Sequence, residues 1–270
     1  MPSLRRPRHP EGRMSLADHF RELRNRAFIA ALAVLVCAVL GWIYYQDLFD
    51  VILRPLLEVR DERGDALVNI NFGGSITQPF SVRLTVSIFV GVVLASPVWI
   101  WQIWGFLLPG LRPREKRIAL AYFLVSVPLF FAGCALAAWA LPQTVAVLLS
   151  FTPTGAANLQ DAMVYLHFIL YFIVAFGIAF LLPVIMVGLN SLRVLPVRIM
   201  IKGWRIALVG ILIFAALVTP DPSAWTMIAL SIPMFALYWC AVAVSALLER
   251  RRRKRDPDWL ATPDDQASAL

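Results

Sequence analysis

Charge is scarce in this chain. Only 16% of its 270 residues are Asp, Glu, Lys or Arg, whereas 60% are apolar or aromatic. Ordinary soluble domains carry about 25% charged residues. The apolar residues also form long uninterrupted runs that a water-soluble fold of this length cannot hide. The composition therefore excludes a soluble globular protein and predicts a membrane protein.

Motifs for catalysis and metal binding are also missing. The three cysteines, Cys37, Cys134 and Cys240, lie inside apolar runs and share no metal-ligand spacing, so we expect neither a disulfide nor a zinc site. The sequence contains no nucleophile elbow, phosphate-binding loop, dinucleotide fingerprint or histidine pair with metal spacing. We therefore expect no enzymatic activity, no metal and no cofactor.

The apolar runs predict an all-α protein with six transmembrane helices. Backbone polar groups in lipid must find partners within their own segment, so each run is expected to be helical. The six segments are residues 27–45, 82–108, 118–141, 162–189, 204–218 and 225–248. Prolines inside four of them predict kinked helices that form a concave face: Pro97, Pro128, Pro183 and Pro233. The fifth segment is about 22 Å long, against a hydrocarbon core of about 30 Å, so it barely crosses.

The basic residues predict the orientation. Of the 25 lysines and arginines, 21 lie before the first segment, between the second and third, around the loop between the fourth and fifth, or after the sixth. Positive residues concentrate on the cytoplasmic side of membrane proteins, so both termini are expected there. The membrane domain, residues 27–248, then follows a basic cytoplasmic segment, 1–26, and precedes a basic and then disordered tail, 249–270. A net charge of +8 arranged in this way does not indicate nucleic acid as a partner.

The long external loop, residues 46–81, is expected to hold a short helix. Its apolar residues Leu48, Val51 and Ile52 keep a helical spacing up to Pro55. Within the six segments, Arg83 near an edge and His167 are the ionisable residues that stand out. A lone histidine in a span serves either as a proton relay or as a group bonded to a neighbouring carbonyl, and both interpretations stay open.

Two carboxylates at the predicted cytoplasmic surface are the candidate site. Glu22 lies in the segment 18–26, just before the first span, and Glu115 lies among bases at 112–117. One interpretation is an exposed ion pair, worth about 1 kcal/mol or less. The other is a binding site in which each carboxylate accepts a guanidinium from an arginine-bearing ligand.

Four blocks of sequence resemble one known family. They are H-F-R-E-L-R-N-R at 19–26, the stretch from Ser96-Pro97 through W-Q-I-W-G-F-L-L-P-G-L at 101–111, R-E-K-R at 114–117, and T-P-D-P-S at 219–223. Together they resemble the TatC family, the multi-spanning subunit of the twin-arginine protein translocase. The likeness extends over about residues 14–250 and includes the predicted topology.

The resemblance implies a receptor for signal peptides with paired arginines, which exports folded proteins with the proton-motive force. It implies a bacterial cytoplasmic (inner) membrane, single-span partners of the TatA and TatB type, and further copies of the chain. By position, Glu22 and Glu115 correspond to the carboxylates that hold the arginines, with Arg24 and Phe106 as neighbours. Structural roles or later transport steps are implied for His19, Pro55, Pro109 and Asp221.

Two positions depart from the family, of which Phe20 in place of a usual leucine is the minor one. Where relatives often carry glutamate or glutamine in the fourth span, this chain has Leu181. Two other functions stay open at this point, a small-solute secondary transporter and a scaffold that only organises other membrane helices.

Overall fold

A computed structural model describes residues 16–63, 68–72, 75–107, 116–151, 158–218 and 224–253. Of the predicted site residues, Pro109, Glu115 and Asp221 lie outside these ranges. The chain divides into two compact units. The first comprises residues 1–54, 69–128 and 159–170, and the second comprises 55–68, 129–158 and 171–270. Each unit is described by itself.

The described residues are mainly helical, so the predicted all-α membrane fold is confirmed. The helices are α1 (Leu16–Ile43), α2 (Tyr45–Arg63), α3 (Gln78–Leu94), α4 (Ser96–Leu107), α5 (Lys116–Ser150), α6 (Ala162–Ser191), α7 (Val197–Lys202), α8 (Trp204–Val218) and α9 (Ala224–Arg253). Two short strands that the sequence does not predict, β1 (Val68–Asn71) and β2 (Asn158–Asp161), pair in a two-stranded sheet.

Within the described part of the chain, four helices are long and apolar enough to cross a membrane: α1, α5, α6 and α9. Helices α3 and α4 meet the same criterion as one bent pair, and α8 is a shorter apolar helix. Each predicted segment therefore corresponds to helix in this structure, whereas the number of complete crossings stays a prediction. Helix α5 continues beyond Leu141, the predicted end, as far as Ser150.

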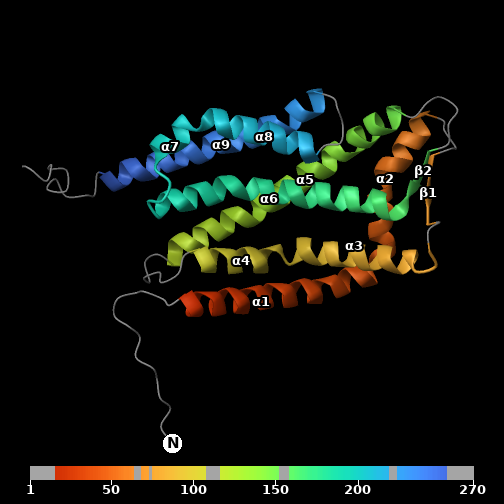
Figure 1. The fold of residues 1–270 in the computed structure, drawn as a ribbon, viewed down its shortest axis with the longest axis horizontal. Helices are drawn as coiled ribbons and strands as arrows, with labels where there is room; N and C mark the ends of the chain where they lie inside the picture. Colours follow the sequence, from red (N-terminus) through yellow and green to blue (C-terminus); the bar gives the residue numbers. More distant parts are fainter. Residues whose placement is uncertain are drawn as a thin grey trace, which may run out of the picture. The chain divides into compact units, whose positions relative to one another are not determined.

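In the first unit, α1 packs along α3 and α4 (Figure 1). The helices approach closely because glycines lie where they meet. A Cβ atom added at Gly91 of α3 would lie 2.5 Å from the carbonyl oxygen of Val34 on α1. A Cβ atom at Gly41 of α1 would lie 2.9 Å from the Cα atom of Ser87. This tight contact sets the position of α1 against α3.

The bend between α3 and α4 is 56°. It falls at Ala95, just before the Ser96-Pro97 pair, because proline has no N–H to continue the helical hydrogen bonds and restricts the residue before it. The indole N–H of Trp99 donates to the carbonyl oxygen of Val92 at 2.9 Å, which satisfies a backbone acceptor at the bend. The predicted bend near Pro97 is confirmed, while α6 and α9 continue as single helices through Pro183 and Pro233.

The start of α6 belongs to the first unit and packs against α3. Val82 and Val86 of α3 contact Ala162 and Leu166 of α6, and all four side chains are fully buried. Asp161 precedes α6, and its Oδ1 atom accepts the backbone N–H groups of Met163 and Val164 at 2.9 and 3.1 Å, as an N-cap does. The expected helix in the first external loop is confirmed, but α2 runs past Pro55 to Arg63.

The second unit contains the later part of α6 with α7, α8 and α9. Helix α6 ends at Ser191, and Arg193 then takes a φ of 61°, the left-handed conformation that often ends helices. The Asn190 side chain donates to the carbonyl oxygen of Leu195 at 2.8 Å, and Arg252 of α9 donates to the carbonyl oxygen of Asn190 at 3.2 Å. The end of α6 is therefore tied to the last turns of α9. Leu181, which stands where the family resemblance led us to expect a polar group, is buried.

Candidate functional site

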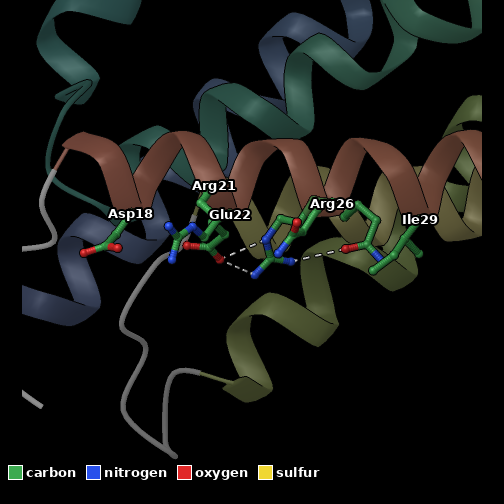
Figure 2. Close-up of a pocket in the computed structure, with 7 residues that line it drawn as sticks. Asp18, Arg21, Glu22, Arg26 and Ile29 are labelled. Carbon is green, nitrogen blue, oxygen red and sulfur yellow. Dashed lines mark hydrogen bonds and ion pairs between the residues drawn. The ribbon is translucent and has the colours of Figure 1, made fainter. Parts of the chain in front are cut away.

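The candidate site is a groove between the first turns of α1 and helix α4. The apolar first span was predicted to begin at residue 27, but the helix itself begins at Leu16, so the whole 19–26 block is helical. Residues three and four apart on a helix share a face. The groove has a volume of about 390 Å³, and the α1 residues that line it follow this spacing. They are Asp18, Arg21, Glu22, Asn25, Arg26 and Ile29, and Gln102 of α4 completes the lining (Figure 2).

Glu22 and Arg26 form an ion pair at the centre of this groove. The Nε atom of Arg26 donates to Oε1 of Glu22 at 2.9 Å, and its Nη2 atom donates to the same oxygen at 2.6 Å. The pair spans one helical turn, and the side chains are 26% and 23% exposed, so its net stabilisation is at most about 1 kcal/mol. Both bonds end on Oε1, so Oε2 of Glu22 takes no part in the pair.

Arg26 also connects α1 to α4. Its Nη1 atom donates to Oε1 of Gln102 at 3.3 Å. A Cβ atom at Gly105, one turn further along α4, would lie 2.2 Å from this same nitrogen. Glycine at position 105 therefore leaves the space that the guanidinium fills.

An aromatic contact lies one turn before Glu22. The rings of His19 on α1 and Phe106 on α4 are stacked, with centroids 4.5 Å apart and planes 23° apart. The structure thus brings together three of the predicted site residues, Glu22, His19 and Phe106. Arg24 is exposed and does not line the groove, because it lies on a different face of α1 from Glu22.

Four other predicted residues are not placed against the groove: Pro55, Pro109, Glu115 and Asp221. Glu115 falls outside the described ranges, between α4 and α5. Pro55 lies in α2, in a stretch whose side chains the structure does not describe. Among the described residues, no group of three His, Cys, Asp or Glu side chains is close enough to hold a metal ion.

Sequence reasoning missed Arg26, Gln102 and Gly105 as parts of the site. The spacing of four between Glu22 and Arg26 was available as a signal, since such pairs meet on a helix. A glycine inside an apolar helix costs about 1 kcal/mol relative to alanine, which indicates that something approaches closely. The approaching group is Arg26 of α1, and this contact depends on the tertiary structure, so no local sequence pattern could predict it.

The fold and the groove define an α-helical polytopic membrane protein that presents a carboxylate and several arginines at the start of its first helix. A family model described as "Sec-independent protein translocase protein (TatC)" matches residues 18–233. The chain belongs to the TatC family, a membrane component of the twin-arginine translocase.

Individual relatives agree with this assignment. The TatC protein of Xylanimonas cellulosilytica is 38% identical over 244 residues, which cover 90% of this chain and 87% of the relative. That of Rothia mucilaginosa is 37% identical over 261 residues, 96% of this chain and 88% of the relative. A crystal structure of the twin arginine translocase receptor TatC matches with a TM-score of 0.69 at 30% identity, covering 85% of this chain and 98% of that one. The resemblance seen in the four sequence blocks is therefore confirmed.

Proposed function

We propose that this chain is the receptor subunit of a twin-arginine translocase. It binds signal peptides with paired arginines in the α1–α4 groove, through Glu22 and, from the adjoining segment, Glu115. With single-span subunits of the TatA and TatB type and further copies of itself, it exports folded proteins across the bacterial inner membrane, driven by the proton-motive force. It moves its cargo without covalent chemistry.

The observation that carries this proposal is the ion pair in the groove. Glu22 already accepts two hydrogen bonds from one guanidinium, that of Arg26. A peptide arginine would use the same charge-assisted bonds, which are about twice as strong as neutral ones. Oε2 of Glu22 makes no hydrogen bond to Arg26 and can accept one from a peptide arginine. Asp18, which lines the groove one turn earlier, adds a negative charge that attracts such a cationic ligand.

The predicted orientation supports the same function. The groove lies at the N-terminal end of α1, mostly within the basic segment 1–26, which is the part of the chain expected in the cytoplasm. A signal peptide reaches the translocase from that side before its cargo has crossed. Arg21, in the groove lining, and Arg24, exposed on another face of α1, would meet lipid phosphates and so hold the acids at the level of the headgroups.

The test is binding of a synthetic peptide to the purified full chain. Twin-arginine and twin-lysine versions of one signal peptide are titrated against the wild type, Glu22→Gln and Glu115→Gln. A hydrogen-bonded charge is worth about 1.5–3 kcal/mol, so each variant should bind the twin-arginine peptide roughly 10- to 150-fold more weakly. Asp50→Asn, an exposed acid on α2 outside the groove, is the matched control and should bind normally. Unchanged affinity in both glutamate variants, or equal binding of the twin-lysine peptide, would reject the proposal.

A further inference from the structure

A second cavity lies within the other unit, bounded by α6, α7, α8 and α9. Its volume is about 510 Å³. Residues from all four helices contribute to its wall, among them Met186, Ile199, Gly210, Phe214, Met234 and Tyr238. Two of the isoleucines that line it, Ile199 and Ile206, are 57% and 79% exposed, so the cavity is a groove that opens on the outer surface of this unit.

The wall of this groove is apolar. Among the described residues that line it, only Tyr238 has a side chain that contains oxygen or nitrogen. Its hydroxyl group already donates to the backbone carbonyl oxygen of Met200. The groove therefore offers no side-chain hydrogen bond to an occupant, and only a hydrocarbon body fits it without loss of hydrogen bonds.

One end of the same groove is strongly basic. Between Asp161 and Asp221 the sequence has no acidic residue, yet it has four basic ones, Arg193, Arg198, Lys202 and Arg205. Gly203 lines the groove, Lys202 precedes it directly, Arg205 follows it by two residues, and both basic side chains are exposed. Among the described residues, none of Arg198, Lys202 and Arg205 forms an ion pair. The local charge is therefore available to a ligand.

This basic end has the character of a membrane interface. The guanidinium of Arg205 lies 5.6 Å from the centre of the Trp204 ring. Tryptophan and arginine are enriched where hydrocarbon meets headgroups. Helix α7 packs against α9 (Figure 1), and Arg252 of α9 reaches the end of α6, so the basic side chains of this unit gather at one end.

We propose that this groove binds an anionic phospholipid, with an acyl chain against α8 and the acidic headgroup on Arg198, Lys202 and Arg205. The charge complementarity identifies the ligand: the occupant must be hydrocarbon along its length and negative at one end. An acyl chain gains little by leaving other lipid tails for an apolar wall. Selectivity therefore comes from the headgroup, at roughly fivefold in affinity for each basic side chain near the membrane surface.

The experiment measures lipid retained by the purified full chain in detergent, by native mass spectrometry. Dioleoyl-phosphatidylglycerol and dioleoyl-phosphatidylcholine are added separately, and soluble glycerol phosphate is added as a headgroup without chains. The wild type should retain phosphatidylglycerol at least tenfold more tightly than phosphatidylcholine, and glycerol phosphate should not compete. Equal retention of the two lipids, or competition by glycerol phosphate, would overturn the proposal.

Two sets of variants separate the headgroup from the chain. The triple variant Arg198→Gln, Lys202→Gln, Arg205→Gln should lose the preference for phosphatidylglycerol. Gly210 lines the groove, and a Cβ atom added there meets nothing within 4 Å. Gly210→Ala therefore fills a small part of the groove, and Gly210→Leu fills more of it. Retention of both lipids should fall in that order, and the alanine variant keeps the test usable if the leucine variant does not fold.

A matched control excludes a diffuse effect of charge. Arg250→Gln with Arg251→Gln removes two exposed bases that follow Tyr238, the last residue of α9 in the groove lining, by at least 12 residues, or about 18 Å of helix. The selectivity of this variant should equal that of the wild type. If it loses as much preference as the triple variant, the lipid is held by general surface charge and the proposed site is wrong.

Discussion

Arg26 of α1 occupies the space in which a side chain at position 105 of α4 would lie. A Cβ atom at Gly105 would be 2.2 Å from Nη1 and 2.9 Å from Cζ of that arginine. The guanidinium therefore connects three groups at once: the Glu22 carboxylate, the Gln102 amide and the open backbone at Gly105. The geometry of the groove depends on this one side chain.

Gly105→Ala should displace Arg26 without unfolding the protein. The obstructing atoms are the far end of a flexible side chain, so they can shift at low cost, and alanine in a helix gains up to about 1 kcal/mol over glycine. We expect a melting temperature close to that of the wild type, together with a change in affinity for the twin-arginine peptide. A large fall in melting temperature would show that Arg26 cannot move.

Arg26→Gln should raise the affinity for a twin-arginine peptide. The resident guanidinium competes for Oε1 of Glu22 and repels an incoming arginine. Its removal should strengthen binding by roughly fivefold, the equivalent of about 1 kcal/mol for a partly exposed pair. In a Glu22→Gln background the same change should have no such effect. A weaker complex in the single variant would mean instead that Arg26 holds Glu22 in its binding geometry.

Gly91→Ala should destabilise the contact between α1 and α3. The added methyl group would meet the Val34 carbonyl oxygen at 2.5 Å, and a backbone atom cannot move aside as a side chain can. Overpacking of this kind costs about 1–3 kcal/mol. Gly210→Ala is the matched control because its methyl group enters open space, and it should be neutral or stabilising. Thermal unfolding of both purified variants checks the difference.

Arg83→Gln should weaken the end of α1. The Nη2 atom of Arg83 donates to the carbonyl oxygen of Trp42 at 2.9 Å, in the last turn of α1. The guanidinium also lies 4.4 Å from the centre of the Trp42 ring. A cation near a helix C-terminus and a cation–π contact each contribute about 0.5–1 kcal/mol. The melting temperature should fall, and Arg83→Lys should recover part of the loss because it keeps the charge.

The start of α6 should weaken in acid. The Gln78 amide donates to Asp161 at 2.9 Å, and this bond, followed by the Val164 N–H, holds the pKa of Asp161 below its usual value of 3.8. A lowered pKa means that the folded state favours the carboxylate. The stabilisation is therefore complete above pH 3.8 and is lost as the pH falls through the lowered pKa. Asp161→Asn should be less stable than the wild type near neutral pH, and the difference in melting temperature should shrink below pH 3.8.

Hydropathy predicted where helices lie in the membrane and was less informative about where they begin and end. The first span was expected from Ala27, yet α1 begins at Leu16, because the polar 16–26 segment is helical without being apolar. The third span was expected to stop at Leu141, before a proline, but α5 continues through it. Hydropathy reports the solvent around a segment, and helix ends depend on local hydrogen bonds that it does not record.

The sequence predicted even less about the contacts that form the candidate site. The motif around Glu22 was recognisable from sequence, and the position of Phe106 close to it followed from the family resemblance. Arg26 was visible only as one more basic residue, and its contacts with Gln102 and Gly105 join positions nearly eighty residues apart. Local patterns identify which residues share a helical face, whereas contacts between helices follow from how two faces meet.

The bend at Ala95 determines where the α4 side of the groove lies. Helix α4 has 12 residues, so it is about 18 Å long, and a rotation of 56° moves its far end by about 17 Å relative to a straight continuation of α3. Gln102, Gly105 and Phe106 lie on α4 and move with it. The hydrogen bond from the Trp99 indole to the carbonyl oxygen of Val92 helps to fix the angle between the two helices. Residues 95–99 do not belong to the groove lining, yet a substitution there should change the geometry of the groove as much as a substitution inside it.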